Sequence, residues 1–106
     1  MNLSDHQTLS ILATGQTVID VANGKSMEPR IIDGQRIMIE PFQHREDQLL
    51  KVGDIVFVAI KGKFLHHQII EMKGSRGPFV IGNIHNKIDG IVTIDKIYGI
   101  VKPLPK

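Results

Sequence analysis

The apolar residues of this chain are mostly β-branched, and this feature constrains its fold more than any other. The 106 residues include seventeen Ile and eight Val, which occur in short runs separated by Gly, Pro, Asn and Asp. Side chains with two heavy atoms on Cβ fit a pleated, half-buried strand well, and the polar residues between the runs are typical of turns. The sequence therefore predicts a mostly β protein built from many short strands.

One short helix is expected at the N-terminus. Ser4 as N-cap and Gln7 three residues later form a capping-box pattern. Leu9 and Leu12 lie on one stripe of such a helix, and Gly15 can end it.

Six strands are predicted after this helix, at 16–23, 35–40, 54–60, 64–72, 78–82 and 91–101. Lys61, Gly62 and Lys63 predict a tight hairpin turn between the third and fourth strands. The connections 42–53 and 83–89 are polar, so we expect them outside the core, where loops often carry sites. We expect the strands to coil into an antiparallel sheet or barrel in which 16–23, 54–60 and 64–72 are neighbours, because closure removes exposed strand edges.

The length predicts a single domain over 1–106, with 1–15 as a helical lead-in and 16–102 as the β core. The absence of Cys excludes disulfides, thiolate nucleophiles and Cys-rich metal sites, and no cofactor is predicted. No run of residues approaches the roughly 18 to 20 apolar residues of a membrane helix. The charged residue ahead of the apolar residues Leu9, Ile11 and Leu12 is Asp5 rather than Lys or Arg. We therefore expect no secretory signal and a cytoplasmic location.

The charge distribution argues against nucleic acid as a partner. Residues 51–106 carry nine Lys and Arg against four Asp and Glu, a net +5, but these basic residues are spread over several loops. Aromatic residues are 5% of the chain and Trp is absent, which leaves little surface for stacking on bases. A protein or peptide partner is the better expectation.

The most informative segment is Gly24-Lys25-Ser26-Met27-Glu28-Pro29, directly after a predicted strand. A Ser after a Gly at a strand end can present its hydroxyl and neighbouring N–H groups to a substrate carbonyl. Judged on local physics alone, the same residues also make an ordinary turn.

The wider pattern around this segment resembles the signal peptidase and LexA-type serine peptidase superfamily over residues 16–101. The blocks that carry the resemblance, in chain order, are GKSMEPRIIDGQRIMIEP, KVGDIVFVAI, FLHHQIIE, VIGNIHNKIDG and IYGIV. The resemblance implies the coiled antiparallel β fold of the LexA C-terminal domain, with Ser26 as the nucleophile. It also implies that Ser26, Met27 and Gly24 form the oxyanion and substrate-binding turn.

The fourth strand and the following loop resemble the His-type signal peptidases of eukaryotes and archaea, here without a membrane anchor. The resemblance implies that His67 is the base and that Asp89 is the acid that serves it. Gln68 stands where that family has Arg, and Asn83 stands where it has Asp. We interpret His66 as a solvent-facing residue, since adjacent strand residues point to opposite faces and only one can reach Ser26.

Two functions remain open on this evidence. The first is a serine endopeptidase that cleaves an extended segment of a partner protein, because an unactivated Ser hydroxyl needs an oriented base. The second is an inactive member of the fold that binds a peptide or protein, which Gln68 and Asn83 favour. A metal site made by His66, His67 and His85 is disfavoured, since no metal-binding His spacing is present.

Overall fold

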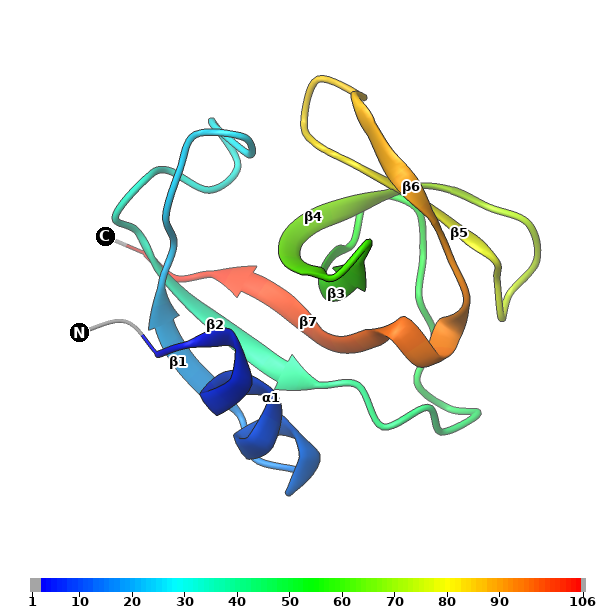
Figure 1. The fold of residues 1–106 in the computed structure, drawn as a ribbon, viewed down its shortest axis with the longest axis horizontal. Helices are drawn as coiled ribbons and strands as arrows, with labels where there is room; N and C mark the ends of the chain where they lie inside the picture. Colours follow the sequence, from blue (N-terminus) through cyan, green and yellow to red (C-terminus); the bar gives the residue numbers. More distant parts are fainter. Residues whose placement is uncertain (1–2, 106) are drawn as a thin grey trace.

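Seven antiparallel strands form one open sheet, and a single α-helix packs against one end of it. A computed structural model describes residues 3–105. The elements, in chain order, are α1 (Asp5–Ala13), β1 (Val18–Val21), β2 (Arg36–Pro41), β3 (Ile55–Ile60), β4 (Lys63–Met72), β5 (Phe79–Gly82), β6 (Ile88–Val92), η1 (Ile94–Lys96) and β7 (Ile97–Pro103). The strand order is β1-β2-β7-β3-β4-β5-β6 (Figure 1). The mostly β prediction with one short helix is confirmed.

The sheet does not close, which differs from the expected barrel. Within residues 3–105, β1 pairs only with β2 and β6 pairs only with β5, so both remain edge strands. The expectation that β1 neighbours β3 and β4 in the sheet is wrong, because β2 and β7 lie between β1 and β3. The C-terminal strand β7 pairs with both β2 and β3, so β1 and β2 lie on one side of it and β3 and β4 on the other.

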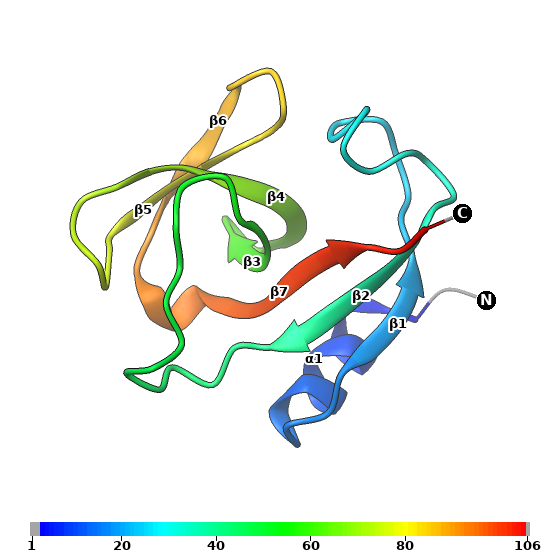
Figure 2. The same cartoon turned by 180° about the vertical axis from the view of Figure 1, so that it is seen from behind.

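Helix α1 has the predicted ends. The Ser4 side chain accepts the Gln7 N–H, the Gln7 side chain returns to the Ser4 N–H, and Gly15 follows the helix with a φ of 86°. The helix lies against one face of β1, β2 and β7, as the opposite views of Figures 1 and 2 show. No helix in the described part of the chain is long and apolar enough to cross a membrane.

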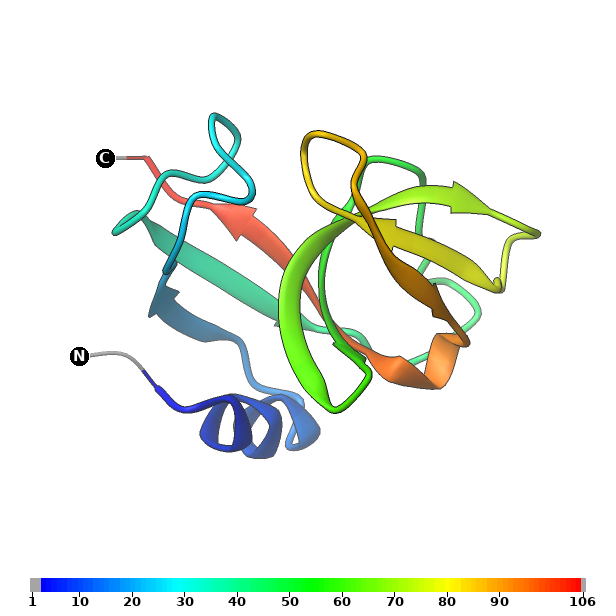
Figure 3. The same ribbon diagram turned by 45° about the horizontal axis from the view of Figure 1, so that its top comes forward.

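The predicted hairpin after β3 is also confirmed. Lys61 and Gly62 connect Ile60 to Lys63 and both have positive φ angles, 52° and 78°, which is the geometry of a two-residue primed turn. Beyond this turn, β4 is long and strongly curved (Figure 3). Its first half pairs with β3, and from Gln68 onward it also pairs with β5.

The predicted strand 91–101 is two strands rather than one. The 3₁₀ turn η1 interrupts it, and the Thr93 hydroxyl donates a hydrogen bond to Asp95 in that turn. Before this turn β6 pairs with β5 at the edge of the sheet, and after it β7 lies between β2 and β3.

Two buried clusters lie along the sheet, and β3 contributes to both. Ile55 and Phe57 pack in the cluster that α1 covers, whereas Val56 and Val58 pack with Phe79 in the other. The 42–53 connection is not wholly outside the core as expected, because Phe42 and Leu50 are buried in the second cluster. Two apolar side chains thus anchor an otherwise polar loop.

Candidate active site

Ser26 lies in the connection between β1 and β2, on an exposed turn. Gly24 opens this turn with a φ of 93°, a conformation that favours glycine. The Gly24 N–H donates to the Asp33 carboxylate at 2.8 Å, which ties the start of the turn to the end of the same connection. Met27 is 4% exposed and inserts its side chain into the core beneath Ser26. The turn is therefore anchored while the Ser26 hydroxyl stays accessible.

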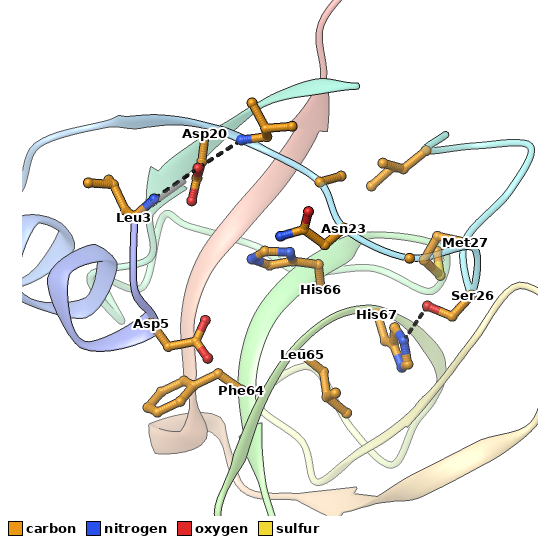
Figure 4. A pocket seen from close by; sticks show the side chains of 14 residues that line it. Leu3, Asp5, Asp20, Asn23, Ser26, Met27, Phe64, Leu65, His66 and His67 are labelled. Atoms are coloured by element: carbon orange, nitrogen blue, oxygen red, sulfur yellow. Dashed lines mark hydrogen bonds between the residues drawn. The ribbon is translucent and has the colours of Figure 1, made fainter. Parts of the chain in front are cut away.

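His67 of β4 reaches the Ser26 hydroxyl. Its Nε2 lies 2.9 Å from Ser26 Oγ, as the dashed line in Figure 4 shows, although the two residues are 41 positions apart in the chain. The pairing of His67 with Val56 in β3 fixes the position of its backbone, and its side chain is 12% exposed. A largely buried imidazole is thus held in hydrogen-bond reach of an exposed hydroxyl.

Asp89 of β6 completes a linear arrangement. Its Oδ2 lies 2.5 Å from His67 Nδ1, and its side chain is 23% exposed. An ionised carboxylate only accepts hydrogen bonds, so His67 carries its proton on Nδ1 and donates it to Asp89. Nε2 is then free to accept the Ser26 proton. The predicted convergence of Ser26, His67 and Asp89 is confirmed as geometry.

The loop between β5 and β6 contacts the Ser26 turn and leads into the strand that carries Asp89. The Ile84 N–H donates to the Ser26 carbonyl at 3.3 Å. The Asn83 side-chain oxygen accepts the N–H groups of His85 and Lys87 at 2.9 and 3.0 Å. Asn83 therefore shapes the loop from which the chain enters β6 and reaches Asp89.

Gln68 joins three parts of the site. Its side-chain oxygen accepts from Arg30 at 3.0 Å, and its side-chain nitrogen donates to the Asn83 carbonyl at 2.9 Å. Gln68 and Asn83, which differ from the motif of the resembled family, thus belong to the hydrogen bonds that support the site. Neither forms a hydrogen bond with His67 or Asp89 among the described residues.

Two backbone N–H groups beside the nucleophile are available to bind an oxyanion. The hydrogen bonds within residues 3–105 use neither the Ser26 N–H nor the Met27 N–H as a donor. The Gly24 N–H is engaged by Asp33, so Gly24 contributes its backbone shape and a position on the cavity wall.

His66 points to the opposite side of β4 from His67, but it is not solvent-facing as expected. Its ring packs 5.2 Å from the Phe57 ring, and its Nε2 is buried without a hydrogen-bond partner among the described residues. Burial lowers the pKa of His66, and the charges of Asp5 and Asp20 oppose this change. The imidazole is therefore neutral at neutral pH.

A cavity of about 240 Å³ adjoins Ser26 and His67, between the end of β1 and the start of β4 (Figure 4). Both flanking strands offer unpaired edges. Within the described part of the chain, β1 pairs only with β2, and residues 63–67 of β4 pair with β3 but not with β5. Because the cavity lies at the edge of β4, residues from both faces of that strand line it.

Asp5 and Asp20 also line this cavity, and the sequence reasoning did not identify either. A signal for Asp20 was present, since it alternates with Val18 and Ala22 and so occupies the buried face of its strand. A carboxylate on an apolar strand face needs a specific partner or a function. Asp5 gave no comparable signal, because acidic residues commonly begin helices.

Among residues 3–105, no three His, Cys, Asp or Glu side chains are grouped so that they could hold a metal ion. The arrangement of Ser26, His67 and Asp89 is that of an activated nucleophile with an oriented base, suited to attack on a carbonyl.

No protein-family model matches this chain, and no curated protein sequence is significantly similar to it.

Proposed function

We propose that this protein is a serine endopeptidase that cleaves extended peptide segments of a partner protein. One observation carries the proposal: three side chains from distant parts of the chain form a continuous hydrogen-bonded line. Ser26 Oγ lies 2.9 Å from His67 Nε2, and His67 Nδ1 lies 2.5 Å from Asp89 Oδ2. A nucleophile, a base and an orienting acid in this order are what acyl transfer requires.

The reaction begins when Ser26 Oγ attacks the scissile carbonyl carbon and its proton moves to His67 Nε2. Asp89 stabilises the imidazolium, while the N–H groups of Ser26 and Met27 donate to the oxyanion. The C–N bond then breaks, and His67 gives its proton to the leaving amine. A water molecule, deprotonated by His67, attacks the acyl ester on Ser26, and the ester breaks to release the acid and restore the hydroxyl.

The substrate binds as an added strand in this proposal. The cavity beside Ser26 is flanked by the free edges of β1 and of residues 63–67 in β4. An extended peptide can form backbone hydrogen bonds with an unpaired edge, whereas a folded segment cannot. This restricts cleavage to unstructured parts of a partner protein.

The resemblance to His-type signal peptidases and LexA-type peptidases agrees with this proposal. We accordingly propose that residues 1–106 are one peptidase domain of that fold, without a cofactor and acting in the cytoplasm. The strand order of this open sheet, with β7 between β2 and β3, can be compared directly with the strand order in that superfamily.

The test is Ser26→Ala against a broad library of unstructured peptides, with Ser75→Ala as the matched control. Ser75 is an exposed loop residue that lines no part of the cavity. We expect Ser26→Ala to abolish cleavage. The free energy of unfolding should change by no more than about 0.5 kcal/mol in either variant, because neither hydroxyl lies in the core. Cleavage that survives in Ser26→Ala would show that another group is the nucleophile.

A second readout does not depend on finding a substrate. A fluorophosphonate should form one covalent adduct on Ser26, detected by intact-mass analysis and peptide mapping, because its phosphorus mimics the reacting carbonyl. The adduct should be absent in Ser26→Ala and present in Ser75→Ala.

The alternative function is a peptide-binding module, and the departures at Gln68 and Asn83 favour it. Peptide binding with no Ser26-dependent cleavage and no fluorophosphonate adduct would support this alternative. Both functions use the cavity beside Ser26, so peptide binding alone does not distinguish a peptidase from a binding module.

A further inference from the structure

The cavity beside Ser26 is polar at the end away from the nucleophile. Ser26 and His67 line one end of it, and Asp5, Asp20 and His66 line the other, as Figure 4 shows. No Lys or Arg is among the residues that line it. The volume of about 240 Å³ leaves room for a long side chain.

Among residues 3–105, no cation pairs with either carboxylate. Asp20 is 8% exposed, and its Oδ1 accepts the N–H groups of Val21 and Leu3 at 2.8 and 3.3 Å. Neither Asp5 nor Asp20 takes part in an ion pair within residues 3–105. Lys63 lies with Asp5 around an adjoining surface hollow, outside the cavity itself. A buried carboxylate without a cation favours binding of a positive group.

His66 provides an independent observation at the same end. Its Nε2 is fully buried and has no hydrogen-bond partner among the described residues. A buried polar atom without a partner is costly and usually marks a place where a ligand or water binds. Because this atom has no exposed surface, the neutral ring must turn toward the cavity before Nε2 can accept from an N–H donor.

We propose that this cavity is a specificity pocket for a Lys or Arg side chain of the substrate peptide. The inference rests on the proposed peptidase function. The cationic head group binds among Asp5, Asp20 and His66 Nε2, and its aliphatic stem packs beside Phe64. The three N–H donors of Lys or the five of Arg match the carboxylate oxygens of Asp5 and Asp20.

The pocket also predicts where the basic residue lies in the substrate. Phe64, beside the head-group end of the cavity, is three residues before His67 in the continuous strand β4. At about 3.3 Å per residue of extended chain, three residues span about 10 Å. The basic side chain therefore lies about three residues from the scissile bond.

The experiment measures cleavage and binding separately. Wild-type protein is given a positional-scanning library of unstructured peptides, and the cleaved products are sequenced. In parallel, fluorescein-labelled peptides that differ only in Lys, Arg, Gln or Glu at the preferred position are titrated into the Ser26→Ala variant by fluorescence polarisation. Each assay is repeated with Asp5→Asn plus Asp20→Asn. The amide oxygen that Asp20→Asn introduces can still accept the backbone N–H groups, so the variant removes charge with little change of shape.

Glu71→Gln is the matched control, because it removes one negative charge from an exposed position of β4 outside the cavity. We expect wild type to prefer Lys or Arg over Gln by about tenfold or more, the double Asp variant to lose that preference, and Glu71→Gln to retain it. Far-UV circular dichroism confirms that each variant is folded.

The possible outcomes separate this inference from the proposed function. Cleavage without a basic preference, or a preference that persists in the double Asp variant, would overturn the pocket and leave the peptidase intact. Basic peptides that bind to a protein with no cleavage would refute the peptidase and support the pocket. The absence of both cleavage and binding would refute both.

Discussion

At the scale of single residues, the hydrogen bond from His67 Nδ1 to Asp89 decides which imidazole nitrogen is free. In Asp89→Asn, the amide group can donate to Nδ1 and so favour a proton on Nε2, where it blocks transfer from Ser26. We expect cleavage to fall by about three to four orders of magnitude. Peptide binding should change little, which the polarisation assay measures.

The control for this variant is Asp95→Asn, which changes an exposed acid in η1 outside the site. Cleavage by Asp95→Asn should equal that of wild type. If Asp89→Asn also retained full activity, Asp89 would have no role in orienting His67.

His66 links the fold to pH. Its pKa is lowered chiefly by burial, so the unfolded chain takes up a proton more readily than the folded protein does. The stabilising contribution of neutral His66 is complete above about pH 6.5, the unfolded value, and is lost as pH falls toward the lower folded value. We expect wild type to lose thermal stability on acidification below about pH 6.5, and His66→Phe, which keeps the ring packing, to lose less.

Melting temperatures at about pH 7.5, 6.5 and 5.5, which bracket the ordinary pKa of His, measure this difference. His85→Gln serves as the control, because His85 is exposed in the loop after β5. Parallel pH curves for wild type and His66→Phe would contradict the assignment.

At the scale of elements, β5 and the loop that follows it set the distance between His67 in β4 and Asp89 in β6. A Cβ added at Gly82 would overlap Ile70 Cδ1 and would lie 2.7 Å from the Lys87 carbonyl oxygen. The Ile70 tip can rotate away, but the Lys87 carbonyl is backbone and accepts the Asn83 N–H. Gly82→Ala should therefore destabilise the fold by about 1 to 3 kcal/mol and slow cleavage, because the loop must shift.

Urea denaturation and steady-state cleavage check this prediction. Gly90→Ala is the comparison, since its added Cβ would meet only Ile60 Cγ2, at 3.2 Å, and no backbone atom. Equal effects of the two substitutions would show that the close approach at Gly82 does not matter.

At the scale of the whole molecule, β3 joins the two buried clusters. Phe57 belongs to one and Phe79 to the other, and both are fully buried. Truncation of either to Ala should cost about 3 to 5 kcal/mol, because each leaves a cavity that the sheet cannot fill. Since adjacent β3 residues serve opposite clusters, we expect each variant to unfold in one transition.

Far-UV circular dichroism during urea titration measures both the midpoint and the number of transitions. Two separate transitions in Phe57→Ala would show that the two halves of the sheet unfold independently.

The local sequence determined most of the elements. Ser4 and Gln7 cap the helix, Lys61 and Gly62 make the hairpin, and short β-branched runs form strands, because each depends on contacts between residues close in the chain. The resemblance to the peptidase superfamily supplied Ser26, His67 and Asp89 as candidates, and the structure brings their side chains together. The opposite directions of His66 and His67 followed from the period of two in a strand.

Only the tertiary structure decided the order of the strands and the surroundings of the site. The pattern of apolar residues does not encode that β7 inserts between β2 and β3, or that Phe42 and Leu50 are drawn into the core. Both outcomes depend on contacts between residues far apart in the chain. A strand with a suitable apolar pattern can bury its apolar face beside several different strands, so its pattern alone does not select one. For the same reason, the sequence showed Asp5, Asp20 and His66 as separate polar residues, and only the meeting of α1, β1 and β4 makes them walls of one cavity.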